Sequence, residues 1–378
     1  MANEAISRRI YLDYNASTPI DPGVAAVMRP LLEGAYGNPS SGHWAGKPAR
    51  EALERAREHV AALLGCAAGE IVFTSGGSEA NNLALKGLFF RRGDRRSHIV
   101  TSRIEHPAIL APCRFLERLG ATVTYVPVDA SGLIDPDAIR KAITGDTLLI
   151  SIMHANNEVG TIQPLADIAT IARAHGIPLH TDAAQSVGKI PTSVDELGVD
   201  LLSVAGHKLY APKGIGALYV RRGIGPEPLI HGAGQESGRR AGTESALLAA
   251  ALGKACDIAR DSTGMSAVRR LRDLFWHRLR TAFGDRVILN GHPERRLPNT
   301  LNVSFVGLMG TDVLARIPEV AASTGSACHS GETRLSPVLE AMGVTPEVGM
   351  GAIRFSLGRG TTQEEIETVV DRLRRAVG

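Results

Sequence analysis

The alternation of strand-like and helix-like segments from about residue 71 to residue 220 is the feature that most restricts the fold of this chain. Short apolar runs of strand length are repeatedly followed by segments whose apolar residues recur at helical spacing. Strands that alternate with helices form a largely parallel sheet, because the connection between two parallel strands must cross over the sheet. We therefore predict an α/β fold whose large domain is a mostly parallel, doubly wound sheet sandwiched by helices.

Two domains are predicted from the length of the chain and from a change in its composition. A chain of 378 residues has room for two domains and a large core. The composition changes near residues 255–265, and the last third mixes short strands, a glycine-rich loop and terminal helices. We predict a large domain at residues 17–258 and a smaller α+β domain made of residues 1–16 and 259–378.

The charge balance argues against nucleic acid and membranes as partners. Lys and Arg (42) exceed Asp and Glu (39) by 42 − 39 = 3, which is too few for binding to a phosphate backbone or an anionic bilayer. The first residues carry an early acid and no apolar core, unlike a secretory signal, and no apolar stretch is long enough to span a bilayer. We therefore predict a cytoplasmic protein with no nucleic acid and no membrane partner.

The four cysteines, at positions 66, 113, 256 and 328, are widely scattered. They include no Cys-x-x-Cys pair and are not accompanied by paired histidines, so we expect no disulfide framework and no metal site. Cys66, Cys113 and Cys256 lie in or beside helix-like runs and are predicted to be buried apolar side chains. Cys328 lies among small and polar residues, and we predict that it is exposed, mobile and reactive as a thiolate.

Lys208 lies on a tight connection between two strand-like runs, residues 201–204 and 215–220. An amine at a strand end can be desolvated until it acts as a nucleophile, although a surface lysine in a turn is the alternative. Asp182 and Gln185 follow another short strand upstream, so all three side chains should reach the same edge of the sheet. A lysine that bonds to the cofactor, with an Asp facing a pyridinium nitrogen, is typical of pyridoxal 5'-phosphate. The pairing predicts that cofactor.

Other polar residues also follow strand-like runs or occupy loops. Near Ser78 a strand, a Gly-Gly turn and a helix start coincide, which favours phosphate binding over an ordinary capped helix. His106 follows the next strand and could stack on a cofactor and move protons, or be structural. Thr243, in a glycine-rich basic segment, could reach a phosphate. Asn38 lies in a loop that either lines a site or is, equally, a plain connection. Arg354 on a strand would suit a carboxylate ligand or, equally, a structural salt bridge.

Motifs from about residue 11 to residue 369 add a family resemblance. In chain order they are Tyr11-Leu-Asp-Tyr-Asn-Ala, Gly37-Asn-Pro-Ser-Ser-Gly-His, Thr74-Ser-Gly-Gly-Ser-Glu-Ala-Asn-Asn, Glu105-His, Asn156-Asn-Glu, Thr181-Asp-Ala-Ala-Gln-Ser, Gly206-His-Lys, Arg240-Ala-Gly-Thr, Leu297-Pro-Asn-Thr, Gly325-Ser-Ala-Cys and Ile353-Arg-Phe-Ser-Leu-Gly-Arg. With these motifs the chain resembles the NifS-like cysteine desulfurases. That family belongs to the class V aminotransferase group of fold-type I enzymes, which use pyridoxal phosphate.

The resemblance implies roles around the cofactor ring. Lys208 would form the covalent bond to the cofactor, and Asp182 would keep the ring nitrogen protonated. His106 would stack on the ring. Gln185 would bond the phenolate oxygen, with Asn157 near it.

The resemblance also implies how the phosphate is held. Gly77, Ser78 and His207 would bind it, and Thr243 would reach over from the other subunit of a homodimer. Serine is frequent in desulfurases where Ala205 stands here, so one hydrogen bond to the phosphate should be missing. Ser78 in place of a frequent threonine is a mild change.

For the substrate, the resemblance implies that Arg354 and Asn38 bind the carboxylate and that Cys328 is the nucleophile. Cys328 would take sulfur from L-cysteine as a persulfide, leaving L-alanine, for iron-sulfur clusters, thio-cofactors or thiolated tRNA through a sulfur-acceptor protein. The span 310–323 is shorter than in typical desulfurases, as in selenocysteine lyases of the animal type, so L-selenocysteine stays open as substrate. A class V aminotransferase and a non-catalytic scaffold are the remaining alternatives.

Overall fold

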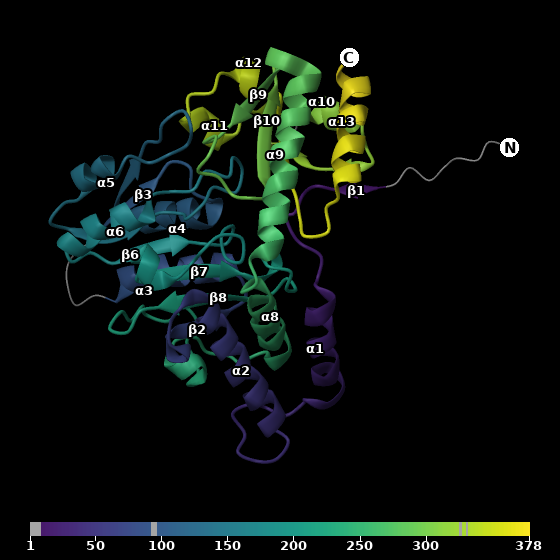
Figure 1. Ribbon diagram of the computed structural model, residues 1–378. Helices are drawn as coiled ribbons and strands as arrows, with labels where there is room; N and C mark the ends of the chain where they lie inside the picture. The colour runs from purple at the N-terminus through teal and green to yellow at the C-terminus, as the bar shows by residue number, and fades with distance from the viewer. Residues whose placement is uncertain (1–8, 92–96, 325–326, 330–331) are drawn as a thin grey trace.

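The structure, a computed structural model, describes residues 9–91, 97–324, 327–329 and 332–378, and only the backbone of residues 327–329, 332 and 333. A seven-stranded sheet in the order β2-β8-β7-β6-β5-β3-β4 forms the centre of the larger part (Figure 1). Its strands are β2 (Ile71–Thr74), β3 (His98–Ser102), β4 (Thr122–Val126), β5 (Thr147–Ser151), β6 (Leu179–Asp182), β7 (Leu201–Ala205) and β8 (Gly216–Val220).

One strand breaks the parallel arrangement of this sheet. β8 is antiparallel to both of its neighbours, β2 and β7, whereas the other pairings are parallel. The connection from β7 to β8 carries only the short helix η2 (Gly206–Lys208) and is too short for a crossover. The prediction of a mostly parallel α/β sheet is therefore confirmed, with β8 as the exception.

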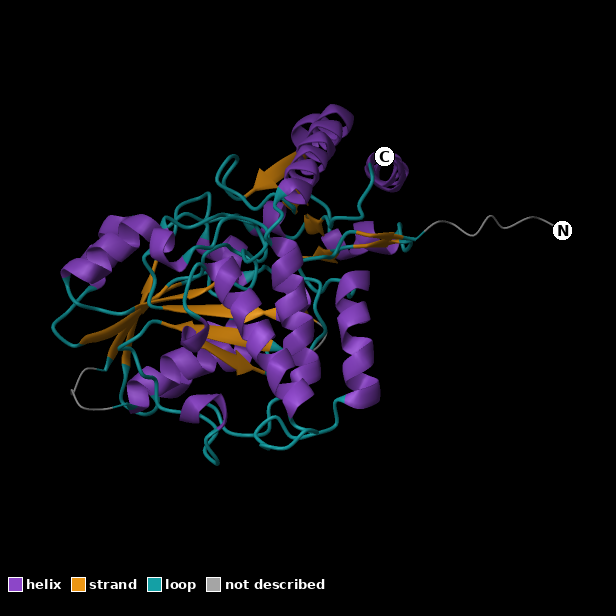
Figure 2. Cartoon of the chain, turned by 60° about the horizontal axis from the view of Figure 1, so that its bottom comes forward, coloured by secondary structure: helices purple, strands orange, loops and turns teal. Residues whose placement is uncertain are grey.

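Both faces of the sheet are covered because its strands are apolar on both sides. Neighbouring residues alternate between two buried clusters: Val100 of β3 and Ile150 of β5 face one, Ile99 and Leu149 the other. The first face packs on α1 (Pro22–Gly34), α2 (Lys47–Leu64), α5 (Pro136–Ala142), α6 (Leu165–Ala174), α7 (Val194–Leu197) and α8 (Ala246–Ala259). The second packs on α3 (Gly77–Phe90) and α4 (Pro107–Glu117). Figure 2 shows the strands between these helix layers.

A second, smaller sheet has the strand order β12-β15-β10-β9. Its antiparallel strands are β9 (Val287–Asn290), β10 (Thr300–Phe305), β12 (Ser323–Thr324) and β15 (Ala352–Ser356). Against them and beside them lie β1 (Ile10–Tyr11), α9 (Thr263–Phe283), α10 (Gly310–Ala315), β11 (Val320–Ala321), β13 (Ala327–His329), β14 (Glu332–Arg334), α11 (Pro337–Ala341), α12 (Pro346–Gly349) and α13 (Gln363–Val377). This part lies at the top of Figure 1.

The small sheet has an apolar core of its own. Its cluster combines the N-terminal residues Ile10 and Leu12 with residues from Met265 to Leu373, whereas α8 contributes to the core of the large sheet. A separate core is what an independent domain requires. This division supports the domain boundaries at residues 16 and 258, which remain our proposal.

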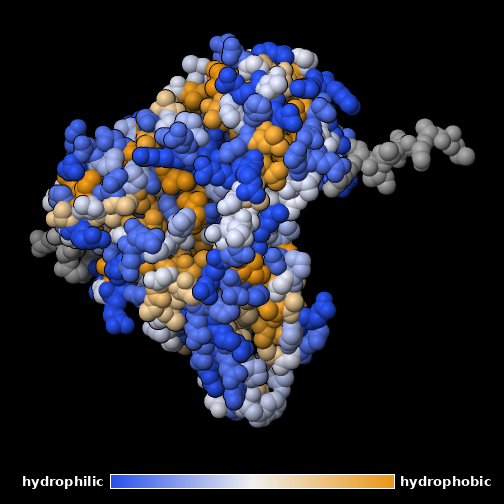
Figure 3. Space-filling model, viewed as in Figure 1, coloured by the Kyte–Doolittle hydropathy of each residue, from blue (hydrophilic) through white to orange (hydrophobic). Residues whose placement is uncertain are grey.

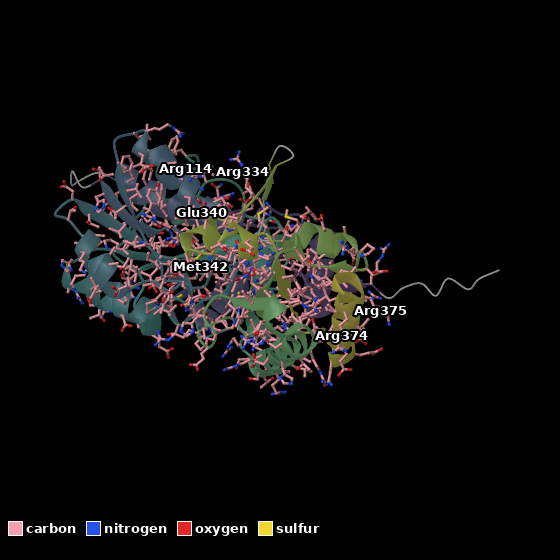
Figure 4. All side chains as sticks on the ribbon, turned by 90° about the horizontal axis from the view of Figure 1, so that it is seen from above. Arg114, Arg334, Glu340, Met342, Arg374 and Arg375 are labelled. Atoms are coloured by element: carbon pink, nitrogen blue, oxygen red, sulfur yellow. The ribbon has the colours of Figure 1, made fainter. Side chains whose placement is uncertain are left out.

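Helix α13 illustrates how local sequence fixes these elements. Thr362 and Glu365 form a capping box at its start. Arg374 and Arg375, labelled in Figure 4, lie in its last turn, where positive charge stabilises the negative end of the helix dipole. The face of the helix with Ile366 packs into the small core.

Hydrophilic and hydrophobic residues are mixed on the visible face of the molecule (Figure 3). On the face seen in Figure 3, hydrophilic residues predominate and hydrophobic ones occur in small groups among them. Within the described part of the chain, no helix combines the length and the apolar character needed to cross a membrane.

Candidate active site

A cavity of about 360 Å³ lies where β6, β7 and the start of α3 meet the small sheet. The C-terminal ends of parallel strands and the N-terminus of a helix meet here, as in ligand sites of other α/β sheets. The predicted site residues that line it are Gly77, Ser78, His106, Asn157, Asp182, Gln185, His207, Lys208 and Arg354. The chain thus brings together residues that the sequence separates by up to 277 positions (354 − 77).

Lys208 ends the short helix η2 directly after β7. Gly206 permits this turn, because a Cβ there would come within 2.9 Å of Ile215. The Lys208 Nζ donates to the carbonyl oxygens of Asn15 (2.5 Å) and Ala16 (2.7 Å). Burial, together with the charge of Arg354, lowers the pKa of Lys208 to about 8. The neutral, nucleophilic amine is therefore accessible near physiological pH.

Asp182 is fixed at the end of β6 by two donors. Its Oδ1 accepts from the Ala184 N–H at 2.9 Å, and its Oδ2 accepts from Asn81 Nδ2 at 2.7 Å. Asn81, on α3, is buried and lines the same cavity. Sequence reasoning missed this partner, although Asn81 stands in a motif that carries the family resemblance.

The start of α3 offers free donors to an anion. Its N-cap, Gly76, has no side chain to accept from the first backbone N–H groups. A Cβ on Gly77 would lie 3.2 Å from the Ala205 side chain, so a larger residue would fill this cradle. His207 Nδ1 is buried and, among the described residues, has no hydrogen-bond partner. Burial, with the charges of Lys208 and Lys213, lowers the pKa of His207 to about 4. These groups fit a phosphate.

His106 is both a cavity residue and the N-cap of α4. Its Nδ1 accepts from the Ala108 N–H at 3.1 Å, so the neutral ring carries its proton on Nε2. Burial lowers the pKa of His106, the Asp182 charge opposes this effect, and the Lys208 charge adds to it. While Nδ1 caps the helix, Nε2 is therefore the ring nitrogen that can exchange protons.

Arg354, on β15, forms a structural salt bridge and is also placed to bind a carboxylate, the two alternatives that its spacing left open. Its Nη2 forms an ion pair with Asp13 at 2.9 Å, and its Nη1 donates to the Asn157 carbonyl at 3.0 Å. Its Nε is buried and unpartnered among the described residues. The guanidinium is thus held by the protein and also lines the cavity, where it can meet a carboxylate.

Cys328 lies in β13, where its backbone pairs with Thr333 of β14. Its side chain lies outside the described residues, so the predicted exposure and reactivity remain predictions. Upstream, Ser323 of β12 pairs with Arg354 of β15. Five residues (328 − 323) span at most about 17 Å, so the hairpin starts within reach of the cavity. Figure 4 labels Arg334 on β14 and Glu340 on the following helix, α11.

Asn15 links the two sides of the site, and sequence reasoning did not single it out. Its carbonyl accepts from Lys208 and from Gln185 Nε2 (2.9 Å). Its side-chain amide bonds to Thr300 Oγ1 (2.8 Å) and to Asn299 Nδ2 (2.9 Å) of the small domain. It is 1% exposed, and its interactions are with residues far away along the chain, so no local pattern reveals them.

Among the predicted site residues whose side chains the structure describes, two do not line this cavity. Thr243 lines a separate pocket near the start of α8. Asn38 is exposed, and its Oδ1 accepts from the Ser40 N–H at 2.9 Å within its own loop. Of the other cysteines, Cys113 and Cys256 are buried as predicted, whereas Cys66 is only half-buried.

The chain matches the class V aminotransferase family over residues 10–369. It belongs to this family. Cysteine desulfurase IscS of Dictyoglomus turgidum is 47% identical over 376 residues, which cover 98% of this chain and 95% of that protein. IscS of Klebsiella pneumoniae is 46% identical, with coverage of 98% and 93%.

Solved structures of the family agree. A NifS-like protein superposes with a TM-score of 0.91 at 37% identity, covering 98% of this chain and 99% of that one. SspA in complex with cysteine gives 0.84 at 40% identity, with coverage of 93% and 100%. Among class V aminotransferases, the chain is thus similar to cysteine desulfurases along nearly its whole length, and the predicted family resemblance is confirmed.

Proposed function

We propose that this protein is a cysteine desulfurase that converts L-cysteine to L-alanine and takes the sulfur onto Cys328. The observation that carries the proposal is the convergence of Lys208, Asp182, His106 and Arg354 on one cavity, with Arg354 paired to Ser323, five residues before Cys328. Relatives named cysteine desulfurase, and a neighbour solved with cysteine, support it.

The donor set supports pyridoxal 5'-phosphate as the cofactor. When bound, it would supply an electron sink for negative charge that develops on the substrate. Lys208 would hold it covalently, Asp182 would keep its ring nitrogen protonated, and His106 would lie against the ring. The free N–H groups of α3, Ser78 and His207 would hold the phosphate. Gln185 would donate to the ring oxygen, with Asn157 close by.

The chain's own groups would perform the sulfur transfer. Arg354 would bind the substrate carboxylate, and Lys208 and His106 would hold and move protons. The Cys328 thiolate would attack the substrate sulfur, so that an S–S bond forms, the Cβ–S bond breaks and Cβ gains a proton. One thiol and one cysteine thereby give one persulfide and one alanine, with no external oxidant.

A homodimer would complete the site. Thr243 lies outside the cavity of its own chain, which is compatible with a phosphate contact across a subunit interface. Asn38 keeps its predicted role at the substrate carboxylate. A sulfur-acceptor protein would then take the persulfide, and a cytoplasmic location remains our prediction.

The test compares Cys328→Ala with Cys66→Ala, since the pKa of Cys66 is raised to about 12 by burial and its thiol should stay unreactive. We expect Cys328→Ala to keep the visible absorbance of the bound cofactor but to lose sulfur release from L-cysteine, and Cys66→Ala to keep both. Undiminished sulfur release from Cys328→Ala would reject the proposal. Alanine formation from L-selenocysteine and from L-cysteine, measured side by side, distinguishes a selenocysteine lyase from a cysteine desulfurase. The short 310–323 span favours the lyase.

A further inference from the structure

Lys189 is a second lysine close to the cavity, and the proposed mechanism does not use it. It lies four residues after Gln185, in the turn that follows β6. Its Nζ donates to Gln185 Oε1 at 3.0 Å and approaches Asn15 Oδ1 at 3.5 Å. Both acceptors belong to buried residues, 6% and 1% exposed. A flexible, strongly hydrated side chain is thus held on two amide oxygens beside the site.

This contact determines which way the Gln185 amide points. The protonated Lys189 can only donate, so in this form the Gln185 amide oxygen faces Lys189 and the NH2 group faces the opposite side. On that side, Gln185 Nε2 donates to the Asn15 carbonyl at 2.9 Å, the same carbonyl that accepts from Lys208. A rotated amide would set NH2 against the ammonium and leave the Asn15 carbonyl with one donor fewer.

The charges around Lys189 agree with a built site. Burial, together with the charges of Lys208 and Arg354, lowers the pKa of Lys189 to about 7. The carboxylates that oppose these charges near Lys208 are Asp13 and Asp182. His106 is influenced by the charges of Asp182 and Lys208. A third cationic side chain beside Lys208 and Arg354 is electrostatically unfavourable, and the amide oxygens of Gln185 and Asn15 offset part of this cost.

We propose that Lys189 is a positioning residue that fixes the Gln185 amide, so that its N–H faces the ring oxygen of the cofactor. The inference rests on the proposed function, because Gln185 meets that oxygen only when the cofactor is bound. A donor to the oxygen stabilises its deprotonated form. Lys189 therefore sets the pH at which the bound cofactor changes its absorbance.

The test is a pH titration of the visible absorbance of the cofactor-loaded protein, without substrate. Lys189→Met should move the midpoint to higher pH by about one unit and weaken cofactor binding about tenfold. Lys189→Arg, which keeps the donors, should restore most of both. Lys254→Met is the matched control, since Lys254 pairs with Asp257 at 2.8 Å on α8, away from the cavity. It should titrate like the wild type.

A double-mutant cycle separates positioning from general electrostatics. If Lys189 acts through Gln185, adding Lys189→Met to Gln185→Leu should shift the midpoint no further. Additive shifts, or a Lys189→Met curve equal to that of Lys254→Met, would overturn the positioning role of Lys189. Either result would leave the proposed function intact. A wild-type protein that gains no visible absorbance with pyridoxal phosphate would overturn the proposed function, and this inference with it.

Discussion

Replacement of Asn15 by alanine tests how much the Asn15 side chain stabilises the fold at the site. The Asn15 side chain makes three short hydrogen bonds: to Thr300 Oγ1 (2.8 Å), to the Asn157 carbonyl (3.2 Å) and from Asn299 Nδ2 (2.9 Å). A hydrogen bond contributes about 0.5–1.5 kcal/mol net. Three of them correspond to about 1.5–4.5 kcal/mol of the free energy of unfolding.

The groups left behind decide where in this range the loss falls. The Asn157 carbonyl still accepts from Arg354 at 3.0 Å, and Asn299 Nδ2 still donates to the Leu357 carbonyl at 3.2 Å. Because these partners keep one bond each, we expect a loss in the lower half, about 2 kcal/mol. The backbone carbonyl that accepts from Lys208 is retained, so cofactor absorbance should persist.

Urea unfolding of the cofactor-loaded protein, followed by circular dichroism at one fixed protein concentration, measures the effect. Gln363→Ala is the control, since it removes a side-chain amide whose bond to Glu367 is exposed, and should change stability by less than about 0.5 kcal/mol. If Asn15→Ala unfolds at the same urea concentration as Gln363→Ala, the stabilising role of the Asn15 side chain is refuted.

Three further predictions follow from the site. Cofactor-free protein should react with pyridoxal phosphate faster as pH rises through about 8, where the buried Lys208 loses its proton; a stopped-flow rate that still climbs between pH 9 and 10 would contradict this. Burial raises the pKa of Glu105 from 4.5 to about 8, so its contribution to stability is present below pH 4.5 and is lost as pH rises through 8; Glu105→Gln should lose less stability than the wild type between pH 5 and 8 in urea titrations. Ala205→Ser should supply a hydroxyl to the phosphate cradle and tighten cofactor binding about tenfold, and an unchanged dissociation constant in an absorbance titration would argue against that contact.

The sequence predicted those site residues whose position depends on local pattern. Lys208, Asp182 and His106 each follow a strand, and the ends of parallel strands meet at one edge of a sheet. Their presence in one cavity therefore followed from periodicity and turn signals. The antiparallel direction of β8 was harder to predict from the sequence, because it depends on the length of one connection and not on the residues of the strand.

What the sequence could not predict depends on contacts between distant residues. Asp13 and Arg354 are 341 residues apart, so the spacing around Arg354 alone left its salt bridge and its role in carboxylate binding equally open. Asn15 and Asn81 are ordinary polar residues in their local sequence, and only the packing of elements shows their partners. Cys66 is half-buried where a buried side chain was predicted, because its position follows the Gly65 turn at the end of α2 and not the helix itself.

The use of His106 Nδ1 as a helix cap links the fold to the protonation state of the imidazole. A doubly protonated imidazole has no lone pair at Nδ1, so the ring would have to release the Ala108 N–H and leave the first turn of α4 uncapped. Each proton that makes the ring cationic therefore carries a conformational penalty that a free histidine does not have. The start of α4 thus favours the neutral form of the His106 imidazole over the cationic one.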